Sequence, residues 1–217
     1  MGTYTGDAIA QMIAEQLTDS GNVIWPEMDI IYPAITEAQN FIVFLRPEAS
    51  SSVVPFTCAA GSCKQEIPAT GLAFLDVTRN LGLNGTTPGK PIKKIPKAVL
   101  DDSVPGWTIE ETTDRIQQYV FEPENPRFFW VYPTPSVALQ VELSQSLVPA
   151  PVASGTDTIS LPDTYITPIL EWVKAVCLLM PSAGTNTNLG LQHQAAFYTM
   201  LGVKRQTDET TEQKRRG

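Results

Sequence analysis

Few residues of this chain are of the types that usually carry out catalysis. His193 is the only histidine among 217 residues, and no recognisable motif surrounds it. A general base or a Ser-His arrangement therefore has little to be built from. The adjacent acids Asp101-Asp102 and Glu110-Glu111 could serve as metal ligands or as an acid/base pair, but neighbouring side chains point in different directions on a helix or strand. We expect solvated loop acids and no active site.

Phosphate and metal chemistry are also poorly supported. The segment "GLNGTTPGK" has glycines and a lysine, but the phosphate-binding loop needs Ser or Thr after Gly-Lys, and here proline follows. An ordinary turn is expected. A Cys3His zinc site could nominally use all the cysteines and the histidine. The gap between Cys58 and Cys63 is wider than the usual zinc-binding spacer, and Cys177 falls in an apolar helical stripe. Free thiols and no cofactor are therefore expected. The residues in question are Cys58, Cys63, Cys177 and His193.

An aromatic ribbon is the least ordinary stretch. "EPENPRFFWVYPTP", residues 122–135, holds four aromatic residues and four prolines. Alternation along a strand places Phe128, Trp130 and Tyr132 on one face and Phe129 and Val131 on the other, so both faces are apolar. Base stacking would need interleaved cations, yet residues 110–142 hold six acids against two arginines. Hydrophobic core or a subunit interface made by these five residues is the leading interpretation. A sugar-binding platform is the alternative.

The ends of the chain have helical periodicity. Apolar residues spaced for one helix face predict a helix over 5–17, and a second helix from the "WPEMD" segment to Arg46. Pro33 should kink this helix or shift its start. Near the C-terminus, Asp163 could cap a helix running to Met180, and a last helix is predicted over 189–201 with Gly202 as its stop.

The middle of the chain is rich in Pro, Gly, Ser and Thr and predicts strands with long loops. Residues 116–121 and 127–132 form a hairpin candidate, and 137–147 would add a third antiparallel strand. We therefore predict an α+β protein: a helical bundle built from N-terminal and C-terminal helix pairs, with an inserted antiparallel β-meander domain. The expected parts are 1–49, 50–160 (the β-rich insertion), 161–203 and a basic tail, 204–217.

Charge argues against general affinity for nucleic acid. The net charge is −8, and binding to phosphates depends on clustered cations. The final segment "KRQTDETTEQKRRG" is basic, with five cations and three acids, so it is either a solvated terminus or a docking peptide. Its cations are Lys204, Arg205, Lys214, Arg215 and Arg216. No run approaches the roughly 20 apolar residues that cross a bilayer, and no secretory signal is visible, so we expect the protein to stay in the compartment where it is made.

The serial order of short motifs resembles that of tailed-phage head-to-tail adaptor, or connector, proteins. The opening "LTDSGNVIWPEMDIIYPAITEAQNFIVFLRPEA" is followed by "FLDVTRN", "VLDDSVPGW", "YVFEPENPRFFWVYPTP", "VELSQSLVP", "LPDTYITPILEWVKAVCLLM" and "HQAAFYTMLGVK". The resemblance covers residues 14–204. Pro33 and the acid-free turn "MPSAGTNTN" depart from the pattern.

The resemblance implies a structural role without catalysis or cofactor. Such adaptors form a ring, usually a dodecamer, beneath the portal, and double-stranded genomic DNA passes through it into the tail. The implied location is the head-tail interface of the virion after synthesis in the host cytoplasm, with no membrane contact. The implied partners are portal protein, a tail or nozzle protein and further copies of the chain, which would share the ribbon. The alternative, from another class, is a receptor- or glycan-binding tail module that uses the ribbon as its platform.

Overall fold

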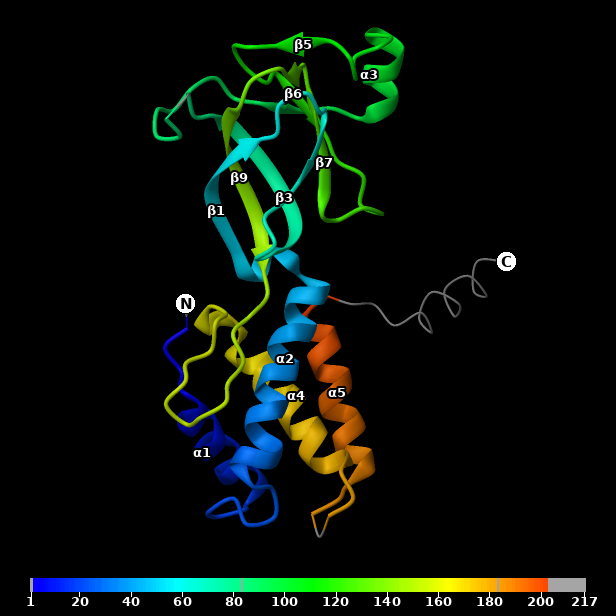
Figure 1. Cartoon of the computed structure of the whole chain (residues 1–217). Coiled ribbons are helices and arrows are strands. Elements are labelled where there is room, and N and C mark those ends of the chain that lie inside the picture. The colour runs from blue at the N-terminus through cyan, green and yellow to red at the C-terminus, as the bar shows by residue number, and fades with distance from the viewer. Residues whose placement is uncertain (1, 83, 183, 203–217) are drawn as a thin grey trace, which may run out of the picture. The chain divides into compact units, whose positions relative to one another are not determined.

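The chain folds as an α+β protein. The computed structural model describes residues 2–82, 84–182 and 184–202 (Figure 1). Internal contacts divide the chain into two compact units. The helical unit comprises Met1–Ala49 with Pro149–Gly217, and the β-rich unit comprises Ser50–Val148.

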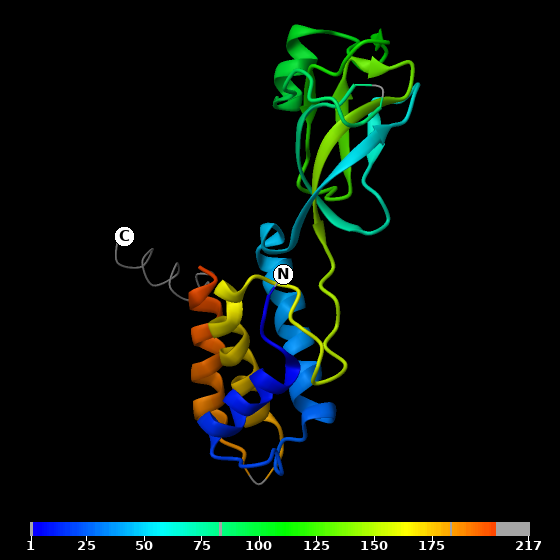
Figure 2. The same cartoon turned by 90° about the vertical axis from the view of Figure 1, so that its left-hand side faces the viewer.

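Four α-helices of the helical unit share one hydrophobic core (Figures 1 and 2). Each helix places fully or almost fully buried side chains in this core. In chain order they include Ile9 and Ile13, Ile35 and Ile42, Val173, and Phe197. The helices and the short turns attached to them are α1 (Gly6–Leu17), a π-helical turn η1 (Glu27–Ile31), α2 (Tyr32–Leu45), the 3₁₀ turns η2 (Pro47–Ser50) and η3 (Asp163–Tyr165), α4 (Ile166–Leu179) and α5 (Thr187–Met200).

The first two helices follow from local signals. Thr5 caps α1 by accepting a hydrogen bond from the Ala8 amide, and this satisfies one of the free N–H groups of the first turn. Pro33 has the predicted effect, because it shifts the start of the second helix. Residues 27–31 form the π turn, which runs directly into α2, and Pro33 then lies in the first turn of α2, where the π geometry changes to α.

The C-terminal helices also form where periodicity predicts them, with one correction. Asp163 does not cap its helix. Its carboxylate instead accepts hydrogen bonds from the amide and the hydroxyl of Thr3, at 2.7 and 2.8 Å. This contact ties the N-terminal segment to the beginning of α4 and lowers the pKa of Asp163. Asn186 caps α5 through Leu189 N, and Gly202, with φ of +72°, follows its end.

Residues 149–162 belong to the helical unit, although the β-rich insertion was expected to extend to 160. The buried amide of Gln39 on α2 accepts a hydrogen bond from Ser160 N at 2.7 Å. Val152 N likewise donates to Thr36 Oγ1. Ile159 and Leu161 enter the helical core. The segment is therefore held along α2 by buried polar and apolar contacts.

The β-rich unit contains two larger sheets and a short helix. One sheet has the order β1-β9-β3 and the other β2-β7-β6-β4, while β5 and β8 pair separately. The elements are β1 (Ser51–Cys58), β2 (Lys64–Glu66), β3 (Gly71–Asn80), β4 (Lys93–Lys94), α3 (Lys97–Ser103), β5 (Glu111–Thr112), β6 (Gln118–Val120), β7 (Phe128–Tyr132), β8 (Thr134–Pro135) and β9 (Leu139–Leu147).

Strand pairing confirms the predicted hairpin and corrects the predicted meander. β6 and β7 are antiparallel, with Tyr119 opposite Val131. The third predicted strand, β9, forms close to its expected place but pairs with β1 and β3 in the other sheet. The chain therefore changes sheets between β7 and β9, at the Tyr132–Pro133 cis peptide and the short β8. The result is two sheets packed on each other rather than one meander.

Candidate interaction surfaces

The inner face of the aromatic ribbon lies in the core between the two sheets. Phe129 and Val131 on β7 are both 0% exposed. The Phe129 ring stacks on Phe74 of β3, with centroids 4.6 Å apart, and meets Phe56 of β1 edge-on at 5.8 Å. Both partner rings come from the β1-β9-β3 sheet. This half of the ribbon is hydrophobic core.

The outer face of the ribbon is covered as well. Trp130 and Tyr132 pack against a small cluster that includes Leu100 of α3 and the buried Trp107. One residue of each acidic pair holds an aromatic side chain of this region. Asp101 accepts a hydrogen bond from the Trp107 indole at 2.6 Å, and Glu110 accepts one from the Tyr132 hydroxyl at 2.9 Å. Asp101 and Glu110 thus anchor aromatic side chains.

Burial within the β-rich unit limits which ribbon residues can contact another subunit. Phe129 and Val131 have no surface to offer a neighbouring subunit, so their assignment to an interface needs correction. Phe128, Trp130 and Tyr132 are partly exposed, and their contact with another subunit stays a prediction. Lysine ammonium groups stand over two of these rings, Lys64 at 4.0 Å from the Phe128 centroid and Lys97 at 5.8 Å from that of Trp130. A flat, open sugar platform is not what this arrangement provides.

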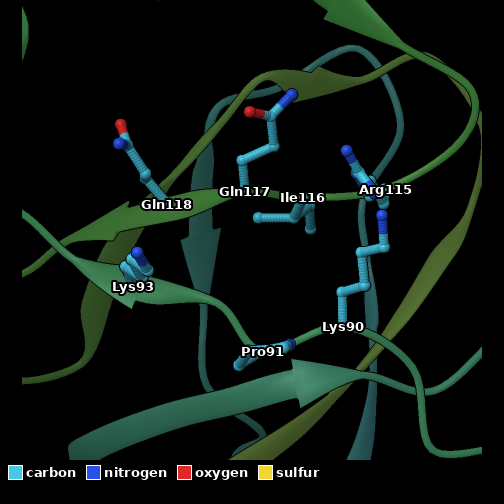
Figure 3. A pocket seen from close by; sticks show the side chains of 7 residues that line it. All are labelled: Lys90, Pro91, Lys93, Arg115, Ile116, Gln117 and Gln118. Atoms are coloured by element: carbon cyan, nitrogen blue, oxygen red, sulfur yellow. The ribbon is translucent and has the colours of Figure 1, made fainter.

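A basic pocket is the second candidate surface of the β-rich unit. It measures about 310 Å³, and three cations and two amide side chains line it (Figure 3). The Lys90 side chain extends toward the segment that carries Arg115, and Lys93 lies on the edge strand β4. Within the described part of the chain, no carboxylate pairs with any of the three. Sequence reasoning assigned "TTPGK" to an ordinary turn and missed this convergence. The amides are those of Gln117 and Gln118.

The backbone beneath the basic pocket is held by one buried amide. The Asn80 side chain donates to Lys90 O at 3.1 Å and to Ile116 O at 2.8 Å, and it accepts from Ile116 N at 3.0 Å. It therefore joins the segment that carries Lys90 to the segment that carries Arg115. A parallel pairing of Lys93 with Gln118 continues the connection. The cations are fixed at their Cα positions before any ligand arrives.

The residues considered for metal binding have other surroundings. Cys58 is buried in the core of the β-rich unit and Cys177 in that of the helical unit, and burial raises the pKa of each thiol to about 12. His193 on α5 shares the Glu171 carboxylate with Lys174, through contacts of 2.6 and 2.5 Å. Among the described residues, no group of three or more His, Cys, Asp or Glu side chains is arranged to hold a metal ion.

In a comparison with known families, the chain matches the SU10 adaptor protein family over residues 4–217. The chain belongs to this family. The match confirms the resemblance to tailed-phage head-to-tail adaptors that the motif order indicates. A search among curated proteins found no match.

Membership makes this SU10 adaptor a phage protein and a component of the virion. No helix in the described ranges is both long and apolar enough to span a membrane. The predicted docking tail, residues 204–217, lies outside the described residues.

Charge is divided unequally between the two units of this SU10 adaptor. The described residues of the helical unit include ten acids and two basic side chains, Arg46 and Lys174. Each of the two cations already pairs with a glutamate of its own unit, Arg46 with Glu48 and Lys174 with Glu171. The β-rich unit has ten acids and eight basic side chains and is nearly balanced. The acidity of the protein is therefore a property of its helices.

Proposed function

We propose that this SU10 adaptor is a structural head-to-tail connector. Its copies form a ring, a dodecamer as the family resemblance implies, that joins the portal to a tail or nozzle protein. Double-stranded DNA passes through the ring without being held. The observation that carries this proposal is the family match over 4–217, and the charge division of the two units supports it.

The acidic helices suit the wall of a DNA channel. Ten acids against two paired cations give the helical unit a strong negative field. A wall of the same sign as the phosphates repels DNA, and it offers no cations for counterion release, so DNA slides rather than binds. On this proposal, the N-terminal and C-terminal helices work together as one bundle that surrounds the passage.

The role requires contacts and no catalysis. Partly exposed ribbon residues, Phe128, Trp130 and Tyr132, are proposed to contribute to contacts between neighbouring subunits, where each Å² of buried apolar surface contributes about 25 cal/mol. The basic tail is proposed to order on the portal, and the ordering entropy is then lost at that step. The receptor- or glycan-binding alternative loses support, because Phe129 lies in the core of the β-rich unit and Trp130 and Tyr132 pack partly against its smaller cluster.

The test is binding to purified portal rings. Native mass spectrometry of portal mixed with the full-length chain should show additional copies in a fixed ratio to portal subunits. Absence of any portal-bound copies would refute the proposal. A second sample lacking residues 205–217 addresses the tail, and undiminished retention of that variant would remove the tail from the docking mechanism while leaving the connector role intact.

A further inference from the structure

The basic pocket on the β-rich unit brings together three cations that form no ion pair with a carboxylate among the described residues. Lys90, Lys93 and Arg115 line one hollow of about 310 Å³. The other described arginines, Arg46, Arg79 and Arg127, each pair with a glutamate. Like charges brought together repel one another. A group of negative charge placed in this pocket would relieve that repulsion.

Hydrogen bonds of the interior hold the backbone of the pocket in place. The buried Asn80 side chain, 8% exposed, binds both cation-bearing segments through three hydrogen bonds. Gly89 lies directly against this clamp, and a Cβ there would come within 3.0 Å of Asn80 O. Backbone segments that are already held in place need not be ordered on binding, and this lowers its entropic cost. Asn80 is therefore a positioning residue for the pocket.

The chemistry of the lining favours carboxylates over nucleic acid. Arginine and lysine bind carboxylates and phosphates alike, so the neighbours of the cations decide. Single-strand binding uses rings interleaved with cations, but the lining has no aromatic side chain. Duplex binding gains affinity from many phosphate contacts, whereas this is one compact group of three cations in a chain of net charge −8. The amides of Gln117 and Gln118 suit the mixed polar surface of a protein.

An acidic protein surface of this kind is present in the chain itself. The described helical unit has eight more acids than cations, and both of its cations are already paired. Asp29, within the π turn, is one exposed acid with no ion-pair partner in the described residues. We propose that the pocket of Lys90, Lys93 and Arg115 docks the acidic helical unit of a second copy of this chain.

This contact deepens the proposed function, because it assigns one of the subunit contacts that a ring requires. It is heterologous: the pocket of one copy meets a different surface on the next, and such contacts propagate until a ring closes. The opposite charges also steer the copies together, and salt weakens this attraction.

Zero-length carbodiimide cross-linking tests the contact directly, since it joins a lysine amine to a carboxylate that touches it. An equal mixture of isotope-labelled and unlabelled full-length protein is cross-linked, both free at high concentration and bound to portal. The expected product joins Lys90 or Lys93 of one copy to an acid between residues 7 and 48, or between 157 and 171, of a copy with the other isotope. Absence of such mixed products in both samples overturns the proposal.

Charge reversal supplies the matched control. The double variant K90E/R115E should lower self-association, measured by sedimentation at low salt, by about tenfold or more. It should still bind wild-type copies through its intact acidic surface. K94E changes charge on the same edge strand but outside the pocket lining, and it should associate normally. Equal loss in both variants would overturn the assignment to the pocket.

A DNA arm and a portal arm separate the remaining outcomes. If duplex DNA binds the wild type in low salt and K90E/R115E alone loses that binding, phosphate is the ligand and the proposed protein partner is wrong. Portal retention is measured on the same samples. Failure of the wild type to bind portal refutes the connector role, whereas mixed cross-links in the free protein would still support the pocket.

Discussion

Replacing Phe129 with alanine separates a core role of the ribbon from an interface role. A buried phenylalanine removes roughly 150–250 Å² from water, which corresponds to about 4–6 kcal/mol at about 25 cal/mol per Å². Alanine retains part of this burial, whereas loss of the stacked contact with Phe74 adds about 1 kcal/mol to the cost. Phe129 is fully buried, so Phe129→Ala should destabilise the β-rich unit by about 4 kcal/mol, within the range found for such substitutions.

Hydrogen exchange read by mass spectrometry localises this loss to one unit. Amides of β9 in the β-rich unit should lose protection by about a thousandfold, because 1.4 kcal/mol corresponds to a factor of ten. Peptides from α2 and α4 serve as the internal control and should keep their protection. Phe128→Ala is the matched variant, since Phe128 is partly exposed on the same strand, and it should cost about 1 kcal/mol. Equal effects of the two variants, or a loss below about 1 kcal/mol for Phe129→Ala, would refute the assignment of Phe129 to the core.

Two further substitutions test polar contacts. Burial raises the pKa of Glu171, but hydrogen bonds and charge from Lys174 and His193 outweigh this and lower it below 4.5, so its contribution to stability is present at neutral pH and is lost as pH falls through the lowered pKa. Glu171→Gln should cost about 1–2 kcal/mol at pH 7 by urea unfolding, and a deficit that stays unchanged after the pH has fallen through the lowered pKa would contradict the linkage. Asn80→Ala should cost about 2–3 kcal/mol, because it leaves Ile116 N unpaired in the interior. Gln117→Ala changes an exposed residue that directly follows Ile116 and should cost less than about 0.5 kcal/mol. If Gln117→Ala lowered stability as much as Asn80→Ala, the hydrogen bonds of Asn80 would not be the cause of the loss.

The helical unit could be predicted closely because its signals are local. Apolar spacing identifies α1, α2, α4 and α5, and the effect of Pro33 follows from its missing N–H. The prediction that Asp163 caps its helix was wrong because the partner of this side chain is distant in sequence. Its carboxylate is taken by Thr3, about 160 positions away in sequence, and no local pattern reports such a partner.

The β-rich unit shows where sequence reasoning ends. The hairpin of β6 and β7 was predictable because a short turn joins its strands. The pairing of β9 with β1 depends on residues such as Phe56 and Val141, which are far apart in the chain and adjacent in the sheet. Propensity measures how well a side chain fits a pleated surface and does not identify its neighbour. The ribbon could be recognised as apolar on both faces, but its covering layer of Leu100 and Trp107 could not.

The basic pocket was missed for the same reason. Lys90 stands in the lysine-rich segment 90–97, but Arg115 is separated from it by a helix and two short strands and stands in no such run. Their convergence depends on the long-range hydrogen bonds of Asn80. A partial signal was present in the four lysines of residues 90–97, two of which line the pocket, but the contribution of Arg115 could not be read from it.

The uneven distribution of charge has a consequence for assembly. Helical units with a large excess of acids repel one another, so contacts between identical helical surfaces would be opposed by electrostatics at low salt. In a contact between the acidic helical unit of one copy and the basic pocket of the next, the electrostatic interaction is attractive instead of repulsive. On the proposed function, the same distribution would keep DNA from adhering to the helical units and would favour head-to-tail contacts between copies over symmetric pairs. A ring of such contacts has no unmatched end, whereas an isolated dimer leaves one pocket and one acidic surface without a partner.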